Sequence, residues 1–367
     1  MGTGNAPRFG VEEEFLVVDA QTRAPVPRAQ ELIDAAKPRL DGRVSGEITT
    51  WQLETRTHPC TSAAEVLAQL REARTEVGKQ AHELGVRLIA SGSPVLGAAV
   101  PPPMTQGPRQ TLGQQTFRGL HDELAICALH VHVEMPDRDH AVRVSNLLRP
   151  YLPVLLTLTA NSPYWDGRDS GYASWRTMTW PRWPVAGPPP EFASAEHYDE
   201  VVGTLLAAGA LVDRGTVFWD VRPSASHPTL EVRVADVPIT AEESALYAAL
   251  VRALVAHLSA RLDAGEASPQ IPGELMRTAY WRAARDGLCG DGVDLRTGVL
   301  TPAFALLDRM VDEIGPVLDA NGDAGAVAGW LASLRHGGIG AQRQRAAARR
   351  NGRLADVVDY LAEQTIA

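Results

Sequence analysis

Five short segments of this sequence place polar and charged residues at alternate positions. Alternate side chains of a β-strand point to the same face of a sheet, so each segment would be charged on one side and apolar on the other. None of the five contains lysine, and every basic residue in them is arginine or histidine, the types that bind phosphates and metal ions. The alternating polar residues are Glu12, Glu14, Gln52, Glu54, Arg56, His130, His132, Glu134, Asp220, Arg222, Thr229, Glu231 and Arg233.

This mixture of side chains favours one kind of chemistry. Carboxylates gathered on one face repel one another unless a cation lies between them. Mg²⁺ prefers carboxylate oxygens and bridges substrate phosphates, and arginine binds phosphate oxygens through two parallel hydrogen bonds. The pattern is therefore typical of metal-assisted phosphoryl transfer. A sheet face that simply contacts water is the plainer alternative, and His130 with His132 taken alone could indicate zinc.

Several other catalytic signatures do not occur in the sequence. It contains no GxxxxGK[ST] phosphate loop, no GxSxG, no HExxH and no glycine-rich dinucleotide fingerprint. A bound nucleotide would then be held by metal ions and arginines rather than by a glycine-rich loop.

The spacing of apolar residues predicts the elements that must position these side chains. Strands are expected at 8–18, 43–48, 50–57, 86–91, 128–134, 216–222 and 229–235. Helices are expected at 28–40, 61–84, 114–126, 139–149, 196–213 and 240–263, with further helices toward the end. Residues 161–192 form a long loop with four tryptophans, which would pack it onto the core or stack on adenine. No repeat or linker divides the chain, so we expect a single domain over 1–367.

Composition and charge narrow the class of protein further. The 367 residues include 35 basic and 44 acidic side chains, a net charge of −9 that argues against nucleic-acid binding. The three widely spaced cysteines (Cys60, Cys127 and Cys289) indicate reduced thiols and a cytoplasmic protein. The N-terminus lacks the apolar stretch of a secretory signal and no run of about 18 apolar residues appears, so we expect no membrane association.

Short motifs along the chain resemble, in order, those of the bacterial carboxylate–amine ligases of the glutamate–cysteine ligase type 2 family. The resemblance extends from about residue 8 to 360. The motifs are GVEEEF at 10–15, the pair Glu47 and Glu54, LHVHV at 129–133, YASWR at 172–176, GPP at 187–189, WDVRPS at 219–224, EVRV at 231–234 and GAQRQR at 340–345.

The resemblance implies both a fold and a reaction. The fold would be α+β, a glutamine-synthetase-like curved antiparallel sheet with helices packed on one face. The reaction would use ATP and Mg²⁺ to join the γ-carboxylate of L-glutamate to an amine such as that of L-cysteine, through an acyl phosphate. The partners would be these small molecules alone, and the resemblance is compatible with a homodimer.

The same resemblance assigns roles to residues by position. Arg233 would face the transferred phosphoryl group, and Arg176 would lie near the glutamate or the acyl phosphate. His132 and Arg222 would contact substrate or phosphate, or else support the residues that do. Arg343 and Arg345 would grip the triphosphate, although basic residues at helical spacing are also typical of a solvated face. The expected metal ligands are Glu12, Glu14, Glu47, Glu54, His130 and Glu231.

Two departures from the family pattern leave the amine substrate open. Glu134 occupies a position where the family commonly has glycine, and residues 108–127 are shorter than usual. Glu134 would either point to solvent or change which amine is accepted. One alternative function is therefore a ligase for another acid or amine. A second alternative is a protein that binds Mg²⁺ and nucleotide but catalyses no reaction. The charged residues of the predicted site are all present, which argues against this alternative.

Overall fold

A seven-stranded antiparallel sheet forms the centre of the computed structural model, which describes residues 6–97 and 100–367. The strand order is β10-β11-β5-β1-β3-β2, and β4 pairs with the second half of β1. The α+β class and the antiparallel sheet expected from the sequence are thus confirmed. The strands are β1 (Phe9–Asp19), β2 (Val44–Gly46), β3 (Gln52–Arg56), β4 (Val86–Ile89), β5 (Ala128–Glu134), β10 (Val221–Pro223) and β11 (Thr229–Asp236).

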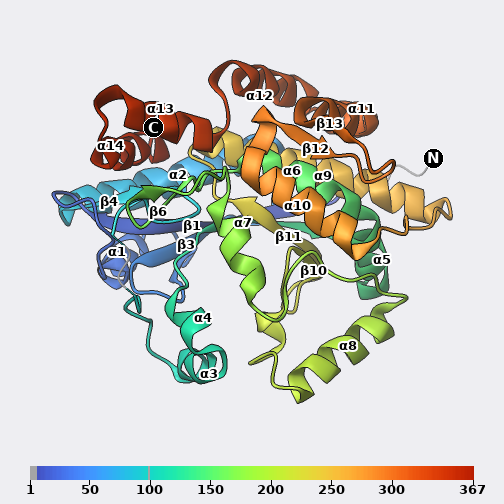
Figure 1. The fold of residues 1–367 in the computed structure, drawn as a ribbon, viewed down its shortest axis with the longest axis horizontal. Helices are drawn as coiled ribbons and strands as arrows, with labels where there is room; N and C mark the ends of the chain where they lie inside the picture. Colours follow the sequence, from blue (N-terminus) through green and yellow to red (C-terminus); the bar gives the residue numbers. More distant parts are fainter. Residues whose placement is uncertain (1–5, 98–99) are drawn as a thin grey trace.

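Most helices lie on one side of this sheet, above it in Figure 1. The remaining strands form short pairs outside this sheet. The pairs are β6 (Tyr164–Trp165) with β7 (Arg168–Asp169), β8 (Ala186–Gly187) with β9 (Phe218–Trp219), and β12 (Asp291–Val293) with β13 (Leu300–Pro302). The helices are α1 (Ala29–Ala36), α2 (Ala63–Glu83), α3 (Pro108–Phe117), α4 (Gly119–Asp122), α5 (Arg138–Leu148), α6 (Leu152–Thr159), α7 (Trp175–Thr179), α8 (Ala195–Ala207), α9 (Ala241–Asp263), α10 (Gly273–Asp286), α11 (Ala303–Asn321), α12 (Ala324–Gly337), α13 (Gly340–Asn351) and α14 (Leu354–Thr365), with 3₁₀ turns η1 (Arg149–Tyr151), η2 (Trp180–Arg182), η3 (Arg214–Thr216) and η4 (Gly287–Cys289).

Side-chain caps explain where several of the predicted helices begin. Ser62 accepts a hydrogen bond from the Glu65 amide at the start of α2, and Asp137 accepts one from His140 at the start of α5. Thr240 begins α9 with a capping box. Each cap satisfies backbone N–H groups that have no partner within the helix.

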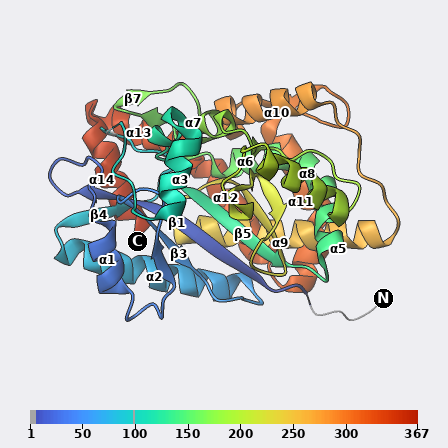
Figure 2. The same cartoon turned by 90° about the horizontal axis from the view of Figure 1, so that it is seen from below.

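The apolar face of the sheet is buried against the long helix α9. Val11 of β1, Val131 of β5 and Val232 of β11 are at most 1% exposed and belong to one core cluster with Leu250 and Leu254 of α9. The alternation in these strands therefore directs their charged residues to the opposite face. Helices α3, α4 and α8 lie on that opposite side, and in Figure 2 α3 and α8 flank β5.

Two of the expected elements differ in the structure. The helix predicted over 114–126 is replaced by α3, which begins at Pro108, and by the short α4; a positive φ of 49° at Arg118 separates them. The strand predicted over 216–222 is divided into β9 and β10, which belong to different sheets. Asp220 lies at this break; it is buried and does not line the pocket described below, whereas Arg222 does. The prediction that Asp220 shares a face with Arg222 is therefore wrong.

One long helix also has the length and composition of a membrane span. Among the described helices, only α9 passes this test, and 67% of its most apolar window is buried inside the structure. It packs against α2, α5 and the sheet, as a core helix does. Residues 1–5, for which the sequence predicts no secretory signal, lie outside the described residues.

Glu13, an acidic residue on the apolar side of β1, has a partner that the sequence did not reveal. Its carboxylate forms a bidentate ion pair with Arg74 of α2, at 2.5 and 3.0 Å, and the two side chains are 0% and 2% exposed. The Arg74 guanidinium also donates to the carbonyl oxygen of Ile239 at 2.6 Å. This buried pair joins the sheet to α2.

Removing one partner of this pair should destabilise the protein strongly. Glu13→Ala leaves the Arg74 charge buried and uncompensated, so we expect the free energy of unfolding to fall by about 3–5 kcal/mol. Urea unfolding followed by circular dichroism measures the change. The control is Glu31→Ala, which removes an exposed ion pair with Arg28 and should leave the unfolding midpoint nearly unchanged. An equal loss of unfolding free energy in the two variants would contradict a stabilising role of the buried Glu13–Arg74 pair.

Candidate active site

A pocket of about 370 Å³ lies on the charged face of the sheet. Its floor is formed by β1, β3, β5, β10 and β11, and its walls by α3, α4, η2 and the turn around η3. The strand register brings the charged pairs together, because Glu12 lies opposite His130 and Glu14 lies opposite Glu54. The sequence-predicted residues that line it are Glu12, Glu14, Glu47, Glu54, His130, His132, Arg176, Arg222, Glu231 and Arg233.

Three carboxylates from β1, β3 and the segment before β3 form the first potential metal position. Oxygen atoms of Glu14, Glu47 and Glu54 lie within 4.8 Å of one another. Glu14 and Glu54 are 9% and 8% exposed, so water screens their repulsion only weakly. Such an all-oxygen group suits a hard cation such as Mg²⁺.

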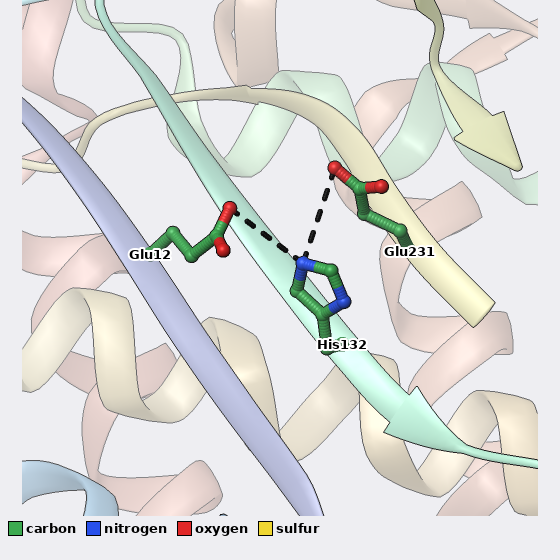
Figure 3. A group of neighbouring side chains, drawn as sticks. All are labelled: Glu12, His132 and Glu231. Carbon is green, nitrogen blue, oxygen red and sulfur yellow. Dashed lines mark ion pairs between the residues drawn. The ribbon is translucent and has the colours of Figure 1, made fainter. Parts of the chain in front are cut away.

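Two further groups of ligands each contain a histidine. Glu12, Glu54 and His130 form one, and Glu12, His132 and Glu231 form the other, again with ligand atoms within 4.8 Å. Figure 3 shows the second group, in which the Nε2 atom of His132 lies 3.6 Å from Glu12 and 3.9 Å from Glu231 on neighbouring strands. Glu12 is shared by both groups, so it would bridge adjacent metal positions.

The protonation of the carboxylates shows how unfavourable this cluster is without a cation. Burial and the neighbouring Glu47 raise the pKa of Glu14 to about 8. Burial raises the pKa of Glu47, and burial together with the charges of Glu12, Glu47 and Glu14 raises the pKa of Glu54 well above its usual range. These groups therefore retain protons that a metal ion would displace.

The histidines that face the carboxylates differ in charge state. Burial, together with the charge of Arg233, lowers the pKa of His130 to about 4, so its imidazole is neutral and can bind a metal. Burial opposes the charged form of His132, but the neighbouring carboxylates of Glu12 and Glu231 outweigh it and raise its pKa. Among the described residues, neither Nε2 atom has a hydrogen-bond partner, although both are buried. These orphaned nitrogens and the crowded carboxylates fit a bound divalent cation.

Arginines hold the other side of the pocket floor. Arg222 donates from Nε and Nη2 to the two oxygens of Glu231 at 2.8 and 3.2 Å, and Arg233 contacts the same carboxylate. Burial opposes ionisation of Glu231, but these two arginines outweigh it and hold its pKa below the usual value. Arg176 of α7 also lines the pocket and is 2% exposed. Three guanidinium groups thus lie beside the proposed metal positions.

One wall of the pocket is aromatic. Phe117 of α3 and Trp183 have ring centroids 4.3 Å apart, and Phe218 lies 4.8 Å from Trp180 and 5.6 Å from Trp183. All four rings line the pocket, so these two tryptophans pack the loop onto the core and also face the cavity. The Nε1 atom of Trp180 donates to the Phe218 carbonyl at 3.3 Å.

Several pocket residues were not found from the sequence. Arg109 and His121 come from α3 and α4, where only a few residues are buried, so no apolar period marks their elements. Arg109 pairs with Asp213 at 2.8 Å, next to η3. The pairing of segments so distant in sequence could be seen only in three dimensions.

The two arginines of the C-terminal motif lie outside this pocket. Arg343 pairs with Glu243 at the start of α9. Arg345 binds Asp169 at 2.6 Å and the carbonyl oxygen of Tyr172 at 2.9 Å. Both guanidinium groups pair with protein carboxylates and neither residue lines the pocket, so the prediction that they grip a triphosphate is not supported, and they are not part of the site that we propose.

Glu134, the residue that departs from the family pattern, points away from the pocket. Its side chain is 39% exposed and pairs with Arg8 at 2.9 Å. It is not among the residues that line the cavity. Of the two positions considered for Glu134 from the sequence, the structure therefore shows the one that points to solvent.

Comparisons with known proteins identify the family of this chain. The family model for glutamate–cysteine ligase family 2 matches residues 8–360. A protein of Mycobacterium sp. (strain KMS) with the provisional name glutamate–cysteine ligase 2-2 is 48% identical over 369 residues, covering 98% of this chain and 99% of that protein. A Nocardia farcinica protein, provisionally named glutamate–cysteine ligase 2-1, is 44% identical over 346 residues, covering 93% and 88%.

Two solved structures share the fold. Glutamate–cysteine ligase from Francisella tularensis, in complex with AMP, has a TM-score of 0.72 and 12% identity, covering 99% of this chain and 90% of that one. A bifunctional glutathione synthetase from Pasteurella multocida has a TM-score of 0.69 and 16% identity, covering 98% and 52%. These likenesses agree with the predicted α+β fold built on an antiparallel sheet.

Sheet, pocket and relatives together define an enzyme of the carboxylate–amine ligase type. The chain belongs to glutamate–cysteine ligase family 2, because the family model spans residues 8–360 and the relatives match over nearly their full length.

Binding of Mg²⁺ should stabilise this protein more at higher pH. The pKa values of Glu14, Glu47 and Glu54 are raised, so the metal-free folded state keeps protons that the unfolded chain loses near pH 4.5, and Glu14 keeps its proton up to its pKa of about 8. Stability without metal therefore falls as the pH rises through this window, and Mg²⁺ replaces the protons. We expect a larger gain in Tm on adding Mg²⁺ at about pH 8 than at about pH 6. Glu54→Gln should reduce the gain in Tm, because it removes one of the carboxylates. An equal gain in Tm of the wild type at both pH values would contradict a carboxylate metal site.

Replacement of Glu134 should leave catalysis unchanged. Glu134→Gln removes only an exposed ion pair with Arg8, so kcat/KM for each substrate should stay within about twofold of wild type. Steady-state kinetics with several amines test this. A large change in amine preference would show that Glu134 acts on the site from outside the pocket.

Proposed function

We propose that this protein uses ATP and Mg²⁺ to join the γ-carboxylate of L-glutamate to the amine of L-cysteine. The observation that carries the proposal is a cluster of five glutamates (Glu12, Glu14, Glu47, Glu54 and Glu231) and His130 beside three arginines in one pocket. Membership of the family supports the reaction class. The finer steps below follow from the chemistry of these side chains.

The carboxylates and His130 would hold the divalent cations. Glu14, Glu47 and Glu54 would form one position, and Glu12 with His130 would contribute to the next. Bound Mg²⁺ would neutralise charge on the ATP phosphates and hold them against the acceptor carboxylate. The raised pKa of Glu14 means that cation binding displaces protons from the cluster.

The arginines would stabilise the transferred phosphoryl group. Arg233 lies 3.4 Å from His130 and contacts Glu231, so its guanidinium is at the border of the metal positions. Arg176 and Arg222 line the same floor. Fixed guanidinium groups stabilise charge that develops on phosphoryl oxygens without reorganisation during the reaction.

The proposed reaction proceeds in two steps and needs no protein nucleophile. A γ-carboxylate oxygen of glutamate attacks the γ-phosphorus of ATP, which forms the acyl phosphate and releases ADP. The substrate amine then attacks the acyl carbon, loses a proton and displaces inorganic phosphate, leaving the amide. The pocket side chains bind, orient and neutralise charge in both steps.

A second candidate keeps this chemistry and changes the amine. Phe117, Trp180, Trp183 and Phe218 give the pocket an aromatic wall. An amine with a larger apolar group would bury that surface. Both candidates use small-molecule substrates.

We also propose that the enzyme is cytoplasmic, because its three cysteines form no disulfide bonds.

Removal of one metal ligand or one arginine should abolish turnover without unfolding the protein. We expect Glu54→Ala and Arg233→Ala each to lower kcat by at least about 10²–10³-fold, because each removes charge stabilisation made in the transition state. Phosphate release from Mg²⁺–ATP with L-glutamate and an amine panel measures this, with mass spectrometry of the product. Far-ultraviolet circular dichroism confirms folding.

The outcomes of this assay separate the candidates, with Glu134→Gln as the matched charge control outside the pocket. A γ-glutamylcysteine product supports the first, and turnover only with a more apolar amine supports the second. A wild-type protein that binds Mg²⁺–ATP but turns over no pair of substrates would refute both. Normal rates in Glu54→Ala or Arg233→Ala would refute the site.

A further inference from the structure

The guanidinium of Arg176 is held by backbone carbonyls of the neighbouring strand. Its Nη2 atom donates to the carbonyl of Arg233 at 3.1 Å, and its Nη1 atom donates to that of Val234 at 3.2 Å. Nε is buried and has no hydrogen-bond partner among the described residues. The head group is thus fixed on one side while it lines the pocket.

These carbonyls are available because β11 departs from regular pairing at this point. Its register against β5 shifts between Val232 and Ala235, and Arg233 and Val234 are the two residues in between. The backbone of one pocket arginine therefore binds the side chain of the other.

A buried carboxylate lies directly behind this pair. Asp236, the last residue of β11, is 0% exposed, and its Oδ1 atom lies 3.7 Å from Nη1 of Arg176. It accepts hydrogen bonds from the hydroxyl of Ser174 at 2.9 Å and that of Ser162 at 2.7 Å. Ser174 caps α7, and Ser162 accepts from the backbone amide of Arg176 at 3.1 Å. Asp236 therefore compensates the charge of Arg176 and also holds the helix that carries it.

The C-terminal motif at 340–345 contacts the same network. Asn161 donates its backbone amide to Asp236 at 2.9 Å. Gln344 of α13 is 0% exposed and donates to the backbone carbonyl and side-chain oxygen of Asn161 at 2.9 and 2.8 Å. A Cβ atom at Gly340 would lie 2.2 Å from that side-chain oxygen, so only glycine fits there. The motif thus packs against Asn161, and its arginines point elsewhere.

We propose that Asp236 is a positioning residue for Arg176, and that Gln344 and Gly340 act on the same arginine through Asn161. The proposal rests on the function proposed above, in which Arg176 stabilises transferred charge. Asp236 does not line the pocket, so its effect must pass through the arginine. An ion pair in this dry interior holds both the charge and the direction of the guanidinium.

A double-mutant cycle on kcat tests the coupling. Asp236→Asn keeps the shape and removes the charge, so we expect kcat to fall by about 10–100-fold, as for other residues that orient a reacting group, while KM for ATP stays within about twofold. In an Arg176→Lys background, the same change should have almost no further effect, because the group that Asp236 orients is already lost. Additive losses would overturn the proposal.

A matched control separates positioning from simple stability. Asp323 is also a buried aspartate close to an arginine, 3.8 Å from Arg252, and it does not line the pocket. Asp323→Asn should lower the Tm without lowering kcat. Equal loss of kcat in the two variants would mean that buried carboxylates matter only for stability. Gln344→Ala, which keeps Asp236, should also lower kcat, and a wild-type rate would remove the C-terminal motif from the proposal.

Crystal structures of wild type and Asp236→Asn provide a readout that does not need turnover. We expect the Arg176 guanidinium to lose its fixed position in the variant, with the strands unchanged. An arginine that stays in place would overturn the proposal even if the enzyme is active. If the wild-type protein has no turnover but Arg176 is displaced in Asp236→Asn, the proposed function is refuted and the positioning role of Asp236 remains. If Asp236→Asn does not fold, Ser174→Ala removes one of its bonds and serves the same test.

Discussion

Repulsion among buried carboxylates is the constraint on which the rest of this structure depends. The register of β1 against β3 and β5 places Glu14 opposite Glu54 and Glu12 opposite His130, with little water to screen them. Burial raises the pKa of Glu14 to about 8, and such a cost is retained only where a cation or a proton relieves it. The arginines and histidines beside the carboxylates in the pocket floor relieve part of this repulsion, and the remainder favours the binding of divalent cations.

The two faces of the same strand treat charge in opposite ways. Glu13 points to the helices and is neutralised permanently by Arg74, so it contributes to the fold. Glu12 and Glu14 point to the pocket, where their neighbours are other carboxylates and histidines with orphaned nitrogens. Side chains of a strand alternate between faces, so of these three consecutive glutamates Glu13 packs against the helices and Glu12 and Glu14 line the pocket.

Irregular backbone, rather than regular pairing, places the arginines. The register shift in β11 turns the carbonyls of Arg233 and Val234 toward Arg176, and the break before β10 leaves Asp220 buried outside the pocket that Arg222 lines. Bulges and breaks of this kind re-aim side chains at functional sites. A strict alternation rule cannot anticipate them, which is why the prediction for Asp220 was wrong.

The sequence by itself determined most of the residues that gather on the charged face, because period-two alternation is a local property of the chain. It also revealed the antiparallel sheet and the metal-binding types of side chain at Glu12, Glu14, Glu54 and His130. Only the tertiary structure decided that Arg343 and Arg345 bind protein carboxylates outside the pocket, that Glu134 pairs with Arg8, and that Arg109 closes a wall with Asp213. Those outcomes depend on which distant segments pack together, and that choice is made by the whole core rather than by any local pattern.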